Sequence, residues 1–120
     1  MSLFYDSPIE DSRPWGKFVQ FTKDEPSTVK ILIVNPGEAF SLQKHFKREE
    51  FWYTLSGSGT VTIDDKSFDI NPGMKFFIPI GSAHRITAGD KTVVMLEIST
   101  GQFDEDDIVR LEDRYGRATS

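Results

Sequence analysis

The chain has 120 residues, the size of one domain that can bury a hydrophobic core of its own. Cysteine is absent, which excludes disulfides and thiolate metal ligands, so any metal must be held by nitrogen and oxygen atoms. The formal net charge of -5 argues against general nucleic-acid binding, and no apolar run reaches the roughly 20 residues of a membrane span.

After an irregular arm expected at residues 1–15, short runs of strand character follow one another along the chain. They lie at residues 16–22, 28–34, 39–43, 50–55, 59–63, 67–70, 75–78, 84–87 and 92–99. The run 28–34 reads Thr-Val-Lys-Ile-Leu-Ile-Val and is rich in β-branched residues, which favour strands. Because turn residues separate the runs at short intervals, the pattern predicts an all-β sandwich or barrel over residues 16–102.

The triplet Asn-Pro-Gly occurs at residues 35–37 and 71–73, each time after a strand-like run and before a segment with a histidine. Proline fixes φ and glycine accepts a positive φ, so each triplet predicts a type II turn. The turns are either unrelated or belong to a barrel whose two halves each bring ligands to one centre. Residues 103–120 are expected to pack on the barrel, and 104–113 fit either a short helix or a last strand. The acidic run 104–107 fits a solvated face or a helix N-terminus.

The chain has two histidines, His45 and His84, and each stands in a patterned context. Gln43 and His45 are two positions apart, so on a strand their side chains point to the same face. Glu50 opens the next strand, and His84 begins another one just after a turn at residues 79–81. If that face is the barrel interior, these four residues bring oxygen and nitrogen donors together, a set that suits one zinc, manganese, iron, cobalt or nickel ion.

Taken one at a time, each histidine is more often a satisfied polar residue than a metal ligand, and Glu50 could be an ordinary surface charge. Both histidines occur in matched frames, however, with glutamine, glutamate, glycines and a proline at fixed offsets. Ligation of one divalent ion by Gln43, His45, Glu50 and His84 is therefore the favoured interpretation.

These two stretches resemble the paired motifs of the cupin superfamily. Gln43 stands where many members place the first histidine of His-x-His, and Ala88 stands where an asparagine usually closes the second motif. Within the cupins, the chain most resembles the isomerase domain of type II mannose-6-phosphate isomerases, which also forms the C-terminal part of bifunctional mannose-1-phosphate guanylyltransferase/isomerases. The matching residues are Arg13-Pro14-Trp15-Gly16, Leu42-Gln43, Arg48, Glu50, Trp52, Ile78-Pro79, His84-Arg85 and the run from Asp106 to Arg117.

The resemblance implies one cupin (jelly-roll-like) β-barrel, a bound divalent ion with zinc as first choice, and isomerisation of mannose 6-phosphate to fructose 6-phosphate. The chain departs from the family at Phe46 and Lys47, where members often continue a run of histidines, and at Phe51, where they often have histidine. The first histidine of the run is kept, so the implied ligand set stands. The missing imidazoles leave the exact sugar open.

An aldose–ketose isomerisation also needs cations for the phosphate and a base. Arg48 ranks first as the phosphate contact because it lies in a connection at the barrel mouth, where strand alternation does not constrain it. Arg85 and Lys47 follow, and each of the three could instead be a solvated surface cation. Glu49, with Lys47 nearby, is the candidate base, and a water bound at the metal is the alternative.

Two other classes of function stay open: a non-catalytic module that binds metal and carbohydrate, and a different metal-dependent cupin enzyme such as an oxygenase. The expected partner is a small sugar phosphate, with neither nucleic acid nor membrane. A homodimer is expected through sheet edges at residues 16–22 and 92–99, because bare edges invite pairing. The first residues lack the basic and apolar stretches of a signal peptide, so a cytoplasmic location is the default expectation.

Overall fold

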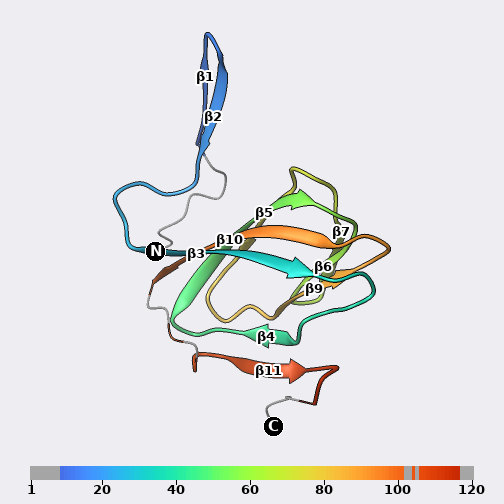
Figure 1. The fold of residues 1–120 in the computed structure, drawn as a ribbon. Helices are drawn as coiled ribbons and strands as arrows, with labels where there is room; N and C mark the ends of the chain where they lie inside the picture. Colours follow the sequence, from blue (N-terminus) through green and yellow to red (C-terminus); the bar gives the residue numbers. More distant parts are fainter. Residues whose placement is uncertain (1–8, 102–103, 105, 117–120) are drawn as a thin grey trace.

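The computed structural model describes residues 9–101, 104 and 106–116, and every regular element in these ranges is a β-strand (Figure 1). The first two strands, β1 (Ile9–Arg13) and β2 (Gly16–Gln20), form an antiparallel hairpin that projects from the body of the molecule. The expectation of an irregular arm was therefore wrong for residues 9–13. The polar sequence of these residues gives no strand signal. Their extended conformation depends on pairing with β2 rather than on an apolar pattern.

Two antiparallel sheets make up the body. The four-stranded sheet has the order β3 (Ser27–Val34), β10 (Val93–Gly101), β5 (Arg48–Ser56) and β8 (Lys75–Ile78). The five-stranded sheet has the order β11 (Val109–Glu112), β4 (Leu42–Lys44), β9 (His84–Ala88), β6 (Gly59–Ile63) and β7 (Lys66–Asp69). From β3 to β6 the chain changes sheet at each step, as in a jelly roll, so the predicted all-β fold is confirmed.

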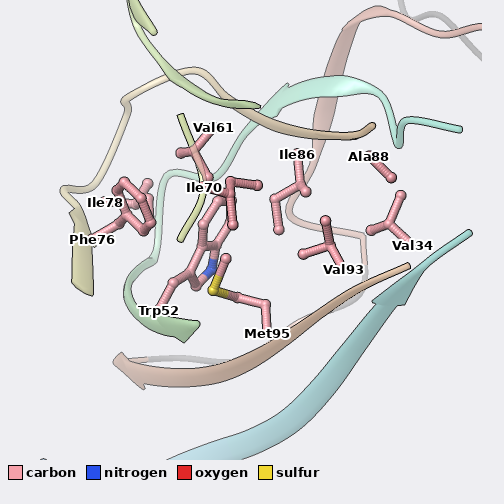
Figure 2. Close-up of a cluster of buried hydrophobic side chains, with 10 residues drawn as sticks. All are labelled: Val34, Trp52, Val61, Ile70, Phe76, Ile78, Ile86, Ala88, Val93 and Met95. Carbon is pink, nitrogen blue, oxygen red and sulfur yellow. The ribbon is translucent and has the colours of Figure 1, made fainter. Parts of the chain in front are cut away.

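The hydrophobic core lies between the sheets (Figure 2). Its buried side chains are Val34, Trp52, Val61, Ile70, Phe76, Ile78, Ile86, Ala88, Val93 and Met95. Both sheets contribute alternate residues to it, which follows from the two-residue period of strands. The Trp52 ring also lies 5.4 Å from the ring of His84, so the apolar core borders the polar site described below.

Both Asn-Pro-Gly triplets form tight turns. The N–H of Glu38 donates to Asn35 O at 3.0 Å, and the N–H of Met74 donates to Asn71 O at 3.1 Å. The glycines at positions 37 and 73 have φ angles of 75° and 88°, which glycine adopts without steric cost. Each turn lies where the chain crosses from one sheet to the other, after β3 and after β7.

Two expectations about edges and ends are settled by the strand order. Residues 92–99 were wrongly expected to form an edge, because β10 pairs with β3 on one side and β5 on the other. Residues 109–112 form a strand rather than a helix, and this strand extends the five-stranded sheet by pairing with β4. Residues 102, 103, 105 and 117–120 lie outside the described part of the chain. No described residue belongs to a helix that could cross a membrane.

Candidate metal centre

Three of the predicted ligands converge between the two sheets. One nitrogen each of His45 and His84 and one carboxylate oxygen of Glu50 all lie within 4.8 Å of one another. His45 follows β4, Glu50 lies in β5 and His84 opens β9, so the cluster joins both sheets. Gln43 of β4 pairs directly with His84 of β9, which puts both side chains on the same face of the sheet. Gln43 also lines a cavity beside the cluster, which is described below.

Backbone carbonyls orient both imidazole rings. His45 Nδ1 lies 2.6 Å from Asp107 O, and His84 Nδ1 lies 3.0 Å from Ser82 O. A carbonyl oxygen only accepts hydrogen bonds, so in each ring Nδ1 carries the hydrogen. The lone pair of Nε2 is then directed at the cluster, which is how metal-binding histidines are usually held.

Two polar atoms of the cluster are buried without a hydrogen-bond partner among the described residues. They are Glu50 Oε1 and His84 Nε2, which lie 3.4 Å apart. A buried polar atom that makes no hydrogen bond costs free energy, so the arrangement favours a cation bound between them. Two imidazole nitrogens and a carboxylate are donors that fit a divalent ion, and Gln43, whose Oε1 accepts a hydrogen bond from Ser41 Oγ at 3.4 Å, is the predicted fourth ligand.

The protonation states of the two histidines agree with metal binding. Burial lowers the pKa of both His45 and His84 to about 4, so both rings are neutral at pH 7 and able to donate a lone pair. Burial raises the pKa of Glu50, although the charge of Arg48 opposes that effect.

Asp107 holds the loop that follows His45. Its Oδ1 and Oδ2 accept hydrogen bonds from the backbone N–H groups of Phe46 and Lys47, each at 2.9 Å. Burial alone would raise the pKa of Asp107, but these two donors outweigh it and the pKa is lowered. The acidic run at residues 104–107 is therefore not simply a solvated face, because Asp107 is buried and its carboxylate binds the ligand loop.

Arg48 is buried against the cluster. Its Nε donates to Glu50 Oε2 at 3.2 Å, its Nη2 lies 3.1 Å from His45 Nε2, and its Nη1 donates to Asp104 O at 3.2 Å. The guanidinium therefore contacts two of the predicted ligands and ties them to the C-terminal segment.

A cavity of about 250 Å³ opens beside the cluster. It is lined by Lys30, Leu32, Phe40, Gln43, His45, Arg48, Glu50, Glu97, Ile108 and Arg110. Three charged members of this set, Lys30, Glu97 and Arg110, were not among the predicted site residues. Two larger hollows have volumes of about 530 and 420 Å³. The first shares Leu32 and Phe40 with this cavity, and neither histidine lines either hollow.

Strand alternation gives a signal for two of these missed residues. Lys30 shares the phase of Leu32 and Val34, and Glu97 shares the phase of the buried Val93 and Met95. A charged residue on the inward phase of a strand is a candidate site residue. Arg110 has no such signal, because its place depends on the pairing of β11 with β4.

Glu97 is a buried carboxylate on the cavity wall. Trp52 Nε1 donates a hydrogen bond to its Oε2 at 3.3 Å. Burial, reinforced by the charge of Glu50, raises the pKa of Glu97 to about 7, while Lys30 and Arg48 oppose the rise. A carboxyl group with such a pKa can both take up and release a proton near neutral pH.

Three of the predicted catalytic residues lie away from the lining of this cavity. Glu49 is one position from Glu50 and so faces the other side of β5, where Thr100 Oγ1 donates to it at 3.4 Å. Lys47 is exposed, with Nζ 3.9 Å from Asp104 Oδ2. Arg85 Nε donates to Phe40 O at 3.0 Å and its Nη2 donates to Glu112 O at 3.1 Å, so this arginine joins strands.

Comparison with known proteins finds similar sequences over almost the whole chain. The family model described as "Mannose-6-phosphate isomerase C-terminal" matches residues 6–113. A mannose-1-phosphate guanylyltransferase 2 of Escherichia coli O157:H7 is 40% identical over 113 residues, which are 92% of this chain and 23% of that protein. The chain thus spans about a quarter of the length of this relative.

Two solved structures resemble the fold. One is from Acidithiobacillus ferrooxidans and carries a provisional description as a sugar phosphate isomerase; it is 30% identical with a TM-score of 0.58, over 63% of this chain and 51% of that one. The other is a cupin-2 domain from Rhodospirillum rubrum, 22% identical with a TM-score of 0.61, over 68% of this chain and 59% of that one. The second likeness concerns the fold alone.

Proposed function

Because the chain belongs to the mannose-6-phosphate isomerase C-terminal family of cupin domains, we propose that it is a metal-dependent aldose–ketose isomerase acting on mannose 6-phosphate and fructose 6-phosphate. The observation that carries this proposal is the buried cluster of His45, Glu50 and His84, which opens onto a cavity lined by cations. Such an isomerase needs polarised oxygens at C1 and C2, a group that moves a proton between these carbons, and a contact for the phosphate.

Gln43, His45, Glu50 and His84 would hold the divalent ion, with zinc as first choice and manganese, iron, cobalt or nickel as alternatives. When bound, the ion supplies a Lewis acid beside the C1 and C2 oxygens of the sugar. Asp107 fixes the ring of His45 through its carbonyl, and Arg48 keeps Glu50 in place. The apolar side chains of Leu32, Phe40 and Ile108 line the same cavity and keep part of its wall dry.

Glu97 is the group we assign to proton transfer, in place of Glu49. Its carboxylate takes the proton from C2 of the aldose and returns it to C1, while the proton of the C2 hydroxyl passes to the C1 oxygen, so the ketose forms with no atom gained or lost. The support is geometric: among the described residues that line the cavity, Glu97 is the carboxylate other than the predicted ligand Glu50. Its pKa of about 7 suits both steps.

The direct test is conversion of mannose 6-phosphate to fructose 6-phosphate by the purified, zinc-loaded protein, followed by a coupled assay for the ketose phosphate. We expect turnover that is lost in Glu97→Gln while the zinc content is kept. Binding of both sugar phosphates without interconversion would replace the isomerase by a binding module. Oxygen consumption with either sugar would instead point to an oxygenase.

A further inference from the structure

Lys30 and Arg110 enter the cavity from different sheets. Lys30 on β3 lies directly opposite Glu97 on β10, and Arg110 on β11 lies directly opposite Gln43 on β4. Residues that face each other across an antiparallel pair point to the same side of the sheet. Each cation is therefore a strand neighbour of a residue that belongs to the site, and both line the same cavity.

The cavity has a local charge opposite to that of the chain. Its described lining holds three cations, Lys30, Arg48 and Arg110, against two carboxylates, Glu50 and Glu97, whereas the whole chain has a net charge of -5. An acidic chain repels anions in general, so a cationic cavity on it concentrates the negative end of a ligand there.

The three cations have different surroundings. The guanidinium of Arg48 contacts His45, Glu50 and the carbonyl of Asp104, so its N–H groups are directed at the cluster. Lys30 and Arg110 line the cavity from β3 and β11, which are edge strands of the two sheets. An anion held by the charged ends of these two side chains leaves the cluster of His45, Glu50 and His84 to the other end of the molecule.

We infer that Lys30 and Arg110 bind the phosphate group of the substrate, a role that Arg85 and Lys47 do not fill from their positions. This assignment rests on the isomerase function proposed above. The planar fork of an arginine and the ammonium of a lysine are the usual cationic partners of phosphate. With the phosphate held there, the C1 and C2 end of the sugar points toward the cluster and Glu97.

The test measures binding rather than turnover. Calorimetric titration of the chelator-treated protein with fructose 6-phosphate, with inorganic phosphate and with fructose separates the phosphate contact from the sugar contacts. We expect Lys30→Gln and Arg110→Gln each to weaken binding of fructose 6-phosphate and inorganic phosphate roughly ten- to a hundredfold, the range of a charge-assisted contact. Binding of free fructose is expected to stay unchanged.

Matched variants remove the same charges elsewhere. Lys91→Gln and Arg13→Gln lie on the exposed surface, away from the cavity lining, and should bind all three ligands like the parent protein. Lys30→Arg and Arg110→Lys keep the charge and should keep most of the preference for phosphate, which guards against a folding defect in the glutamine variants.

The outcomes also separate this inference from the isomerase proposal. Unchanged phosphate binding in both glutamine variants, or a parent protein that prefers fructose to fructose 6-phosphate, would overturn the phosphate site even if the zinc-loaded protein is an isomerase. Loss of phosphate binding in the variants of a protein that shows no isomerisation would keep the phosphate site and refute the isomerase.

Discussion

His45 Nδ1 donates a hydrogen bond to the carbonyl oxygen of Asp107 at 2.6 Å, across 62 positions of sequence. The Asp107 carboxylate binds the next two backbone N–H groups, so one residue fixes both the ring and its loop. Asp107→Ala keeps the backbone carbonyl but removes the carboxylate that holds the loop of His45, so we expect it to weaken zinc binding roughly 10- to 100-fold, as loss of a group that supports a ligand usually does. Competition with a chromogenic chelator measures this, and the exposed neighbour variant Asp106→Asn should leave zinc affinity unchanged.

The second prediction concerns the ligands themselves. Purified protein should bind about one divalent ion per chain, as a single closed set of donors implies. His45→Ala and His84→Ala should each abolish most binding, whereas Gln43→His should be tolerated because it keeps a neutral donor at that place. Elemental analysis after dialysis checks the stoichiometry. Near-parental zinc affinity in the His45→Ala/His84→Ala double variant would refute the site.

The acid stability of the metal-free protein gives a third prediction. The pKa values of His45 and His84 fall from 6.5 to about 4 on folding, so between these values the unfolded chain binds more protons and stability drops as pH falls. The pKa of Glu97 rises from 4.5 to about 7, so between these values the folded chain binds more protons and stability grows as pH falls.

As the pH falls, protonation of Glu97 offsets part of the stability that is lost through the two histidines. Glu97→Gln removes this offset. The free energy of unfolding of this variant should therefore decrease more steeply than that of the parent between pH 6.5 and about 4.5. Urea unfolding across this range measures the slope. An exposed carboxylate offers the control, and Glu112→Gln should leave the slope as it is; equal slopes in Glu97→Gln and the parent would contradict the burial argument.

Arg48 gives a fourth prediction with two signs. Arg48→Ala should lower kcat/KM roughly ten- to more than a hundredfold, because the charge-assisted hydrogen bond that holds Glu50, a contact worth about 1.5–3 kcal/mol, is lost. Zinc affinity should rise, because the variant removes a positive charge that lies 3.1 Å from His45 Nε2. A fall in zinc affinity would mean that Arg48 matters more for holding Glu50 than for its charge.

Assembly gives the fifth prediction. We keep the homodimer as a proposal but place it at the edge strand β3, where Val29, Ile31 and Ile33 are 59%, 51% and 65% exposed. A bare edge beside exposed apolar side chains favours pairing with another strand. Ile31→Lys should shift the mass measured by light scattering toward the monomer, and Ile80→Lys, on a turn, should not. A monomeric parent protein at all concentrations would refute the dimer.

Local pattern was enough to find most strands of the body, because alternation and turn residues are properties of neighbouring positions. The spacing of Gln43, His45, Glu50 and His84 was likewise readable, since strand geometry alone puts the first pair on one face. What could not be read is pairing between distant segments. The central place of β10 depends on partners at residues 27–34 and 48–56, and the approach of Arg110 to Gln43 depends on the register of β11.

The distance in sequence between the ligands and Asp107 has a consequence for how the site is made. A chain leaves the ribosome N-terminus first, so Gln43, His45, Glu50 and His84 all emerge before the residues that hold the loop and close the wall. At roughly 5–20 residues per second, the interval between His84 and Glu112 lasts on the order of seconds. For most of that interval the nascent chain carries every predicted donor but neither Asp107 nor Arg110, so the synthesis of residues 107–110 is the step that turns four donors into a finished site.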